Sequence, residues 1–268
     1  MAIVNTTMSG SDYHQEKEHI SRSTAHRYAG TYGAVRQYYE FQHGSIFEKS
    51  SSLNFGTLVD TACEKLIQEG EWRDWIVSPP RDVLASDGTR KGNAYKQWKS
   101  ELPMDVLECS EADLLKIERC IQSILSNRAA KELITGAIHT QYSVFWTDTA
   151  GHKRKARADG VCKSRWFDLK TTSSEWDKIR YSFREYGYDW QAAWYAEAAR
   201  EAGWEDFRMP FICVQTFAPY ATRVIVPSQA VIDRANEEIR ETLGLIEERK
   251  SSGQFLPDEY HVEHDLDF

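Results

Sequence analysis

Cysteine pairs and long apolar runs are missing from this sequence, and each absence removes a class of protein. The five cysteines are odd in number and form no C-x-x-C pair, so we expect neither a disulfide framework nor a cysteine-bound zinc ion. No apolar run approaches the length of a transmembrane helix, and the polar residues 1–15 lack the apolar core of a signal peptide. These absences predict a reduced, soluble, cytoplasmic protein with no membrane partner.

Three catalytic signatures are also missing. The eight histidines form no H-x-x-x-H or H-E-x-x-H pair, which argues against a zinc hydrolase. No G-x-x-x-x-G-K-[ST] loop is present, so no nucleotide cofactor is expected, and no G-x-S-x-G elbow marks a serine hydrolase. These absences direct attention to carboxylate and lysine side chains.

The composition predicts one large domain. The 268 residues are 41% hydrophobic and include nine Trp and thirteen Tyr, and neither a repeat nor a Pro- or Ser-rich linker divides them. We expect a flexible segment at 1–18, a single domain at 19–256 with its core at about 138–226, and an acidic tail at 257–268. The net charge of −8 argues against a uniformly basic surface but allows a local basic groove.

The hydrophobic period changes from helical to alternating near residue 140. Before it, apolar residues recur at helical spacing, with Ser21 and Ser110 as N-cap candidates, and Asp189 is a cap candidate further on. The three strands from 140 to 172 should be antiparallel, and the element order predicts an α/β domain with an N-terminal helical elaboration. We predict helices at 21–41, 55–68, 94–101, 110–126, 129–133, 176–183, 188–202 and 228–250, and strands at 72–77, 140–147, 153–162, 166–172, 211–217 and 222–226.

The stretch 159–172 holds the strongest candidate site. Asp168 and Lys170 lie two apart on a predicted strand, so their side chains should share a face, while Phe167 and Leu169 point into a core. Asp159 would add a second carboxylate from the neighbouring strand. Carboxylates suit Mg²⁺, which can activate water for phosphodiester hydrolysis, with a lysine neutralising the developing charge. By spacing alone, Asp-x-Lys also fits a solvated strand edge.

Two helical pairs could support this site. Gln191 and Tyr195 are four residues apart, as are Asp60 and Glu64, so each pair shares a helix face. The first pair could hydrogen-bond the site or a DNA phosphate, or be a surface amide beside a core tyrosine. Either acid could bind the metal, or the two could form an exposed acidic pair.

A basic run precedes Asp159 on the same predicted strand. Such a run is either an ordinary solvated strand or a track for a polyanion, and the acids beside it favour the track. The run consists of Lys153, Arg154, Lys155 and Arg157.

Six short motifs together resemble the PD-(D/E)xK nuclease superfamily, and within it the exodeoxyribonuclease VIII (RecE-type) branch of phages and prophages. The resemblance is dense from 140 to 196 and thinner from about residue 20 onwards. The motifs are ISRS at 20–23, GTLVD at 56–60, YSVFWTD at 142–148, KARAD at 155–159, DLKTT at 168–172 and YDWQAAWY at 188–195.

The resemblance implies a central mixed β-sheet flanked by helices and a Mg²⁺- or Mn²⁺-dependent exonuclease that digests double-stranded DNA from 5′ ends. It also implies a ring-shaped homo-oligomer, a single-strand annealing protein as partner in phage-type recombination, and a bacterial or phage-infected host cytoplasm. No iron–sulfur cluster is expected, because only Cys213 lies beyond the core motifs. The implied metal ligands are Asp159, Asp168, the Leu169 carbonyl and Asp60; the implied catalytic residues are Asp159, Asp168, Lys170, Gln191 and Tyr195; and the implied DNA-binding residues are Ser21, Arg22, Ser23, Lys153, Arg154, Lys155 and Arg157.

Two positions depart from the pattern of that family. Asp60 stands where the family usually has His, and Gln141 stands where it usually has Glu. Asp60 can still bind a metal, whereas Gln141 brings no charge, so the number of metal ions stays open. Two other functions stay open as well: an endonuclease or flap-trimming nuclease of the same fold, and a DNA-binding subunit with weakened catalysis.

Overall fold

The structure, a computed structural model, describes residues 2–44, 51–205 and 207–256. The predicted acidic tail at 257–268 lies outside this part. Within the described residues, no helix combines the length and the apolar character that crossing a membrane requires.

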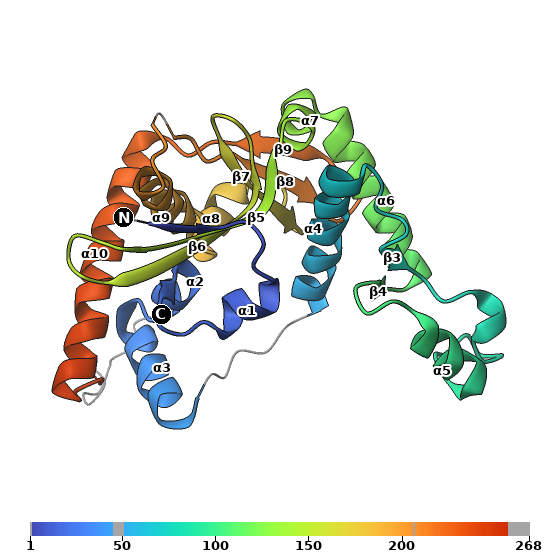
Figure 1. Ribbon diagram of the computed structural model, residues 1–268, viewed down its shortest axis with the longest axis horizontal. Helices are drawn as coiled ribbons and strands as arrows, with labels where there is room; N and C mark the ends of the chain where they lie inside the picture. Colours follow the sequence, from blue (N-terminus) through green and yellow to red (C-terminus); the bar gives the residue numbers. More distant parts are fainter. Residues whose placement is uncertain (1, 45–50, 206, 257–268) are drawn as a thin grey trace, which may run out of the picture.

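A mixed sheet of seven strands forms the centre of the described chain (Figure 1). The predicted antiparallel trio is present, with alternating side chains that fill both faces: β5 (His139–Thr147), β6 (Lys153–Val161) and β7 (Trp166–Thr172). The sheet continues through β8 (Phe211–Gln215), which is parallel to β7, and β9 (Thr222–Ile225), which is antiparallel to β8. The predicted α/β class with a central mixed sheet is therefore confirmed.

The N-terminal segment differs from the expected flexible one. Residues Ile3–Asn5 form β1, which pairs with β5, and residues Gly10–Gln15 form α1. Ile3 and Val4 stay largely exposed, so backbone pairing with a sheet edge, rather than burial of an apolar face, holds this strand. Residues Ile20–Ser21 form β2, which runs parallel to β6. Polarity alone could not predict this order.

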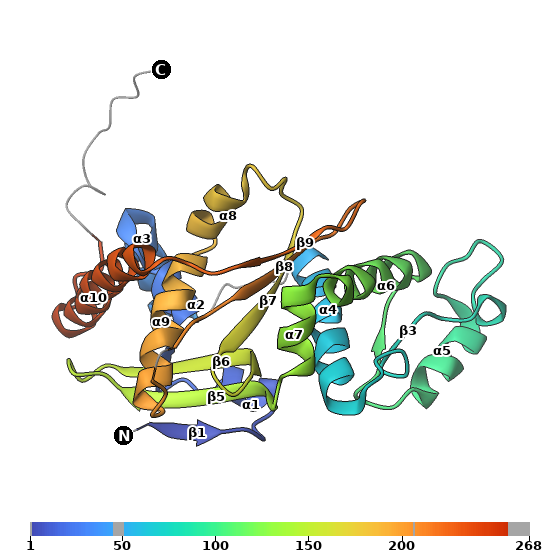
Figure 2. The same cartoon turned by 90° about the horizontal axis from the view of Figure 1, so that it is seen from above.

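Helices cover both faces of the sheet (Figure 2). On one face, α9 (Tyr188–Glu201) and α10 (Gln229–Ser252) enclose an aromatic core that includes Trp146, Trp166 and Trp194. On the other face, a smaller aliphatic core lies under α4 (Ser51–Glu69), α6 (Glu111–Ser126) and α7 (Arg128–Thr135). Phe167 and Leu169 belong to this second core, as the alternation on β7 predicts.

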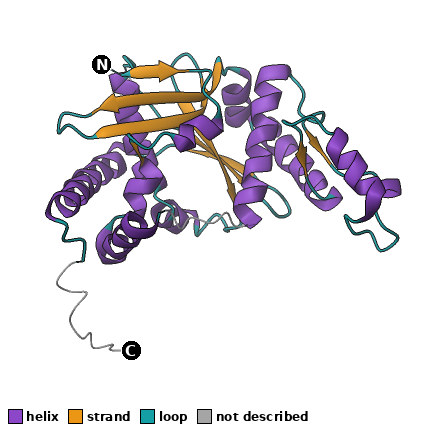
Figure 3. Ribbon diagram, turned by 60° about the horizontal axis from the view of Figure 1, so that its bottom comes forward, coloured by secondary structure: helices purple, strands orange, loops and turns teal. Residues whose placement is uncertain are grey.

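The remaining elements lie around this framework (Figure 3). The predicted helix at 21–41 is two helices, α2 (Arg22–Arg27) and α3 (Gly30–His43), because Ala29 is extended and Gly30 has a φ of +66°. The predicted strand at 72–77 is reduced to β3 (Ile76–Val77), which pairs with β4 (Leu107–Glu108). The other elements are η1 (Arg81–Val83), α5 (Gly92–Glu101) and α8 (Ile179–Glu185).

Two predicted helix caps behave as expected and one does not. Ser21 accepts a hydrogen bond from Thr24 N at the start of α2, and Ser110 accepts one from Asp113 N at the start of α6. Asp189 is not the cap of α9. Gly187 takes that position with a φ of +64°, and a Cβ there would lie 2.6 Å from the His26 ring. Asp189 lies in the first turn instead.

Candidate active site

Three carboxylates meet in one long cleft. Asp60 comes from α4, Asp159 from β6 and Asp168 from β7, and the cleft is also lined by Lys170 and Gln191. Its walls come from the N-terminal segment, from α4 along most of its length, and from residues of β6 and β7. The structure thus brings together residues that are separated by more than 100 positions in the chain.

The cleft begins where β6 and β7 stop pairing. Their registered pairs are Gly160 with Phe167 and Val161 with Trp166, and none follows toward Asp159. Gly160 is required at this crossing, because a Cβ would lie 2.0 Å from the Phe167 ring. Beyond it, the backbone N–H of Leu169 donates to Asp159 Oδ2 at 2.7 Å. The carboxylate therefore occupies the place that a strand partner would fill.

Lys170 lies beside Asp168, as the strand alternation predicts. Its ammonium donates to Asp168 Oδ2 and lies 5.0 Å from the centre of the Tyr188 ring. Burial lowers the pKa of Lys170, but the nearby charges of Asp168, Tyr188 and Asp159 outweigh burial and raise it. Lys170 is therefore a cation held at the cleft floor rather than a neutral base.

The predicted helix pair divides into two roles. Gln191 is buried, and its Nε2 donates to Asp168 Oδ1. Tyr195 does not reach the carboxylates by a hydrogen bond; its hydroxyl donates to the Arg157 carbonyl at 2.6 Å. Gln191 thus belongs to the carboxylate cluster, whereas Tyr195 holds the backbone of β6 against α9.

Burial and, after it, crowding of negative charge raise the pKa values of the carboxylates in the site. Burial, followed by the charges of Asp168 and Glu64, raises the pKa of Asp60 to about 7. Burial and the charges of Asp168 and Asp60 raise the pKa of Asp159 well above its ordinary value. Lys170 opposes both shifts without cancelling them. The site has more negative charge than its own cation balances.

These residues fit a hard divalent cation. Carboxylate oxygens are the ligands that Mg²⁺ and Mn²⁺ favour, and the excess negative charge is what such an ion would neutralise. From the described residues, Asp60 and Asp159 each receive a hydrogen bond on Oδ2, so Oδ1 of each is left for a ligand. Asp60, Asp159 and Asp168 would hold the ion, and participation of the Leu169 carbonyl stays a prediction.

The basic run on β6 is not the open track that the sequence suggests. Arg154 is buried: it pairs with Glu197 at 2.5 Å and lies 3.8 Å above the Trp194 ring. Lys155 is also buried and donates to the carbonyls of Tyr13 and Glu16. Both side chains are thus buried among protein groups, and DNA binding by Arg154 and Lys155 stays a prediction.

The other two members of the run differ in exposure. Arg157 is half-buried and donates to Gln141 Oε1 at 2.8 Å and to the Met8 carbonyl at 2.9 Å, and DNA binding by Arg157 stays a prediction. Lys153 is half exposed and pairs with Glu18. Lys153 alone keeps the accessibility that a phosphate contact needs.

The 21–23 motif lies on the cleft wall. Ser21 caps α2 and Ser23 hydrogen-bonds to Ser21 Oγ at 3.0 Å. Arg22 donates to the Tyr186 carbonyl at 3.0 Å and to Gln191 Oε1 at 3.1 Å. DNA binding by these three residues stays a prediction. Arg22 hydrogen-bonds to Gln191, which in turn hydrogen-bonds to Asp168 of the carboxylate cluster.

Sequence reasoning missed two residues of the site. Tyr188, which lies beside Lys170, is three positions before Gln191, and that helical spacing could have pointed to it. Gln141 was predicted only as a missing charge, yet its Nε2 lies 3.4 Å from Asp60 Oδ2. Its φ of +51° is unusual for a non-glycine residue, and nothing in the sequence signals it.

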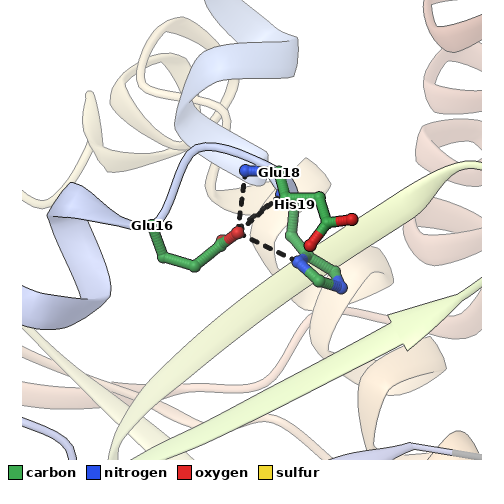
Figure 4. Close-up of side chains that lie close together, drawn as sticks. All are labelled: Glu16, Glu18 and His19. Atoms are coloured by element: carbon green, nitrogen blue, oxygen red, sulfur yellow. Dashed lines mark hydrogen bonds and ion pairs between the residues drawn. The ribbon is translucent and has the colours of Figure 1, made fainter.

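A second acidic group lies outside the carboxylate cluster (Figure 4). Ligand-type atoms of Glu16, Glu18 and His19 lie within 4.8 Å of one another. The Glu16 carboxylate already accepts from the backbone N–H groups of Glu18 and His19 and contacts the His19 ring, while Glu18 pairs with Lys153. These contacts explain the group as a brace for the segment that leads into β2.

Comparison with known proteins places the chain in a family. A sequence profile described as "PDDEXK-like domain of unknown function (DUF3799)" matches residues 16–259. The chain belongs to this PDDEXK-like family. The resemblance to the PD-(D/E)xK superfamily is thus confirmed, and the family supports a nuclease.

One solved structure shows the same fold, and a second is reported with it. A "putative exonuclease" from Eubacterium rectale is 19% identical, with a TM-score of 0.63 over 98% of this chain and 96% of that chain. An alkaline exonuclease from Laribacter hongkongensis is 16% identical, with a TM-score of 0.30 over 75% of this chain and 98% of that chain. A search of curated proteins finds no match.

Proposed function

We propose that this PDDEXK-like protein is a Mg²⁺- or Mn²⁺-dependent exonuclease that hydrolyses phosphodiester bonds of double-stranded DNA from 5′ ends. The observation that supports it best is the convergence of Asp60, Asp159 and Asp168 around Lys170 in an open cleft. The putative exonuclease with the same fold and the RecE-type motifs favour digestion from an end.

A division of labour follows from the contacts of each side chain. A divalent ion, when bound, would activate water and stabilise the leaving oxygen of the phosphodiester. Lys170 places a positive charge beside Asp168, where it can stabilise the charge that develops on the phosphate. Gln191 orients the Asp168 carboxylate, and Tyr195 keeps β6 in position against α9.

Digestion of two DNA forms tests the proposal. Linear duplex with a 5′-phosphate should be degraded with Mg²⁺ or Mn²⁺ and left intact with EDTA, while covalently closed circular duplex should survive. Lys170→Ala should lower the rate about 100- to 1,000-fold, whereas Lys178→Ala, an exposed lysine before α8, should not. Cleavage of the closed circle would establish an endonuclease instead, and duplex binding without turnover would establish a DNA-binding subunit.

The assembly and the setting are part of the same proposal. We propose a ring-shaped homo-oligomer that acts with a single-strand annealing protein in recombination, on the strength of the RecE-type motifs. Light scattering after size-exclusion chromatography tests the first point, because a ring requires at least three copies. A purely monomeric protein would contradict the ring while leaving the nuclease proposal standing.

A further inference from the structure

Both amides in the candidate site stand between an arginine and a carboxylate. On one side, Arg22 donates to Gln191 Oε1 at 3.1 Å, and Gln191 Nε2 donates to Asp168 Oδ1. On the other side, Arg157 donates to Gln141 Oε1 at 2.8 Å, and Gln141 Nε2 lies 3.4 Å from Asp60 Oδ2. The same order of groups occurs twice, on different elements.

Hydrogen-bond chemistry allows each glutamine one orientation only. A guanidinium has donors and no acceptor, so it must face the amide oxygen. An ionised carboxylate has acceptors and no donor, so it must face the amide NH₂. A glutamine between the two makes both bonds in one flip state and loses both in the other. Each arginine therefore fixes the orientation of its glutamine amide, with the NH₂ group turned toward the carboxylate.

We infer that the Arg22–Gln191 and Arg157–Gln141 pairs position Asp168 and Asp60 for the divalent ion, with the arginines acting through the glutamines. Each pair engages one carboxylate oxygen with a neutral donor, so that Asp60 offers Oδ1 to the ion, and Asp168 offers the second lone pair of Oδ2, which also accepts from Lys170. A guanidinium at the same place would neutralise the carboxylate and compete with the ion. Arg22 is thus a positioning residue rather than a direct phosphate contact.

This inference explains the glutamine at position 141. A glutamate there would face Arg157 equally well, but it could not donate to Asp60. Gln141 lies opposite Asp159 in the β5–β6 register, between the pairs Thr140–Gly160 and Tyr142–Ala158. Its φ of +51° departs from the extended backbone of its neighbours. The two departures from the family pattern then act together: Gln141 donates a hydrogen bond to Asp60, and Asp60 is a ligand of the ion.

Binding of Mn²⁺ to the DNA-free protein tests the inference, which rests on the proposed metal dependence. Isothermal titration calorimetry should show that Arg22→Ala and Gln191→Ala each raise the Mn²⁺ dissociation constant about 10-fold or more. The double variant should lose no more than Gln191→Ala alone, because Arg22 acts through that amide. Gln141→Ala should also raise the Mn²⁺ dissociation constant, although it leaves the Arg22–Gln191 pair intact.

Controls separate the possible failures. Arg180→Ala removes an exposed arginine of α8 that hydrogen-bonds to Tyr181, and it should leave Mn²⁺ affinity unchanged. Thermal unfolding of each metal-free variant checks that the protein stays folded. Unchanged Mn²⁺ affinity in Arg22→Ala, or losses that add in the double variant, would overturn the inference but not the nuclease. Failure of the unaltered protein to bind Mn²⁺ would overturn both.

Discussion

The two halves of β6 carry opposite charges. The basic side chains of the first half are paired with protein groups, whereas the acidic side chain of the second half lies among other carboxylates. In the first half, Arg154 and Lys155 are buried; Arg154 pairs with Glu197, and Lys155 donates to the Tyr13 carbonyl. In the second half, Asp159 shares a cluster of carboxylates whose pKa values are raised by burial and by one another. Charge that the chain itself neutralises is structural, and charge that it leaves in excess marks the place for an external cation.

The comparison predicts that removing charge has opposite effects on stability in the two halves. Arg154→Ala would leave Glu197 and Asp148 without their buried partner, which should lower the free energy of unfolding by about 3 kcal/mol. Urea denaturation at pH 7.5 measures this loss. Adding Glu197→Gln should recover part of it, and an equally unstable double variant would contradict the pairing.

The pH dependence of the metal-free protein should reveal the carboxylate excess. Asp60 has a pKa of about 7 in the folded state, above its ordinary value of 3.8, so the folded protein holds a proton that the unfolded chain releases. Stability should therefore fall as pH rises from 5 to 8, by about 2–3 kcal/mol. Denaturation at each pH checks this, with Asp60→Asn as the comparison that should show a flatter profile. Added Mg²⁺ should also flatten it.

Neutralising the acidic half should make the metal-free protein more stable. Asp159→Asn keeps an oxygen that can accept from Leu169 N–H, while it removes one of the crowded charges. We expect a gain of about 1–2 kcal/mol at pH 8 in EDTA together with loss of nuclease activity. Denaturation and a duplex-digestion assay on the same preparation measure the two effects. A destabilised variant would show that Asp159 is already balanced.

The smallest effect is expected at the exposed end of the basic half. Lys153 pairs with Glu18 on the surface, so Lys153→Ala should leave the midpoint of unfolding unchanged. If Lys153 contacts a DNA phosphate, the variant should reduce the slope of log binding constant against log salt concentration by about one. An unchanged salt slope would remove Lys153 as a DNA contact.

The sequence predicts the features of this site that depend on neighbouring residues better than the contacts between residues far apart in the chain. Alternation on β7 was enough to place Asp168 with Lys170 and Leu169 in the core, because strand geometry alone decides it. The burial of Lys155 depends on carbonyls of Tyr13 and Glu16, more than 130 positions away. The bond from Arg22 to Gln191 spans 169 positions. Such contacts depend on the packing of whole elements, which periodicity does not encode.

The register between β7 and β8 links folding of the core to assembly of the site. Asp168, Leu169 and Lys170 pair in order with Phe211, Ile212 and Cys213 of β8. A slip of one residue would turn Leu169 toward the cleft and drive Asp168 and Lys170 into the aliphatic core. Partly misaligned states are therefore excluded by the cost of burying charge. Any molecule of this protein that has folded its sheet has, by the same step, placed its lysine and its carboxylate.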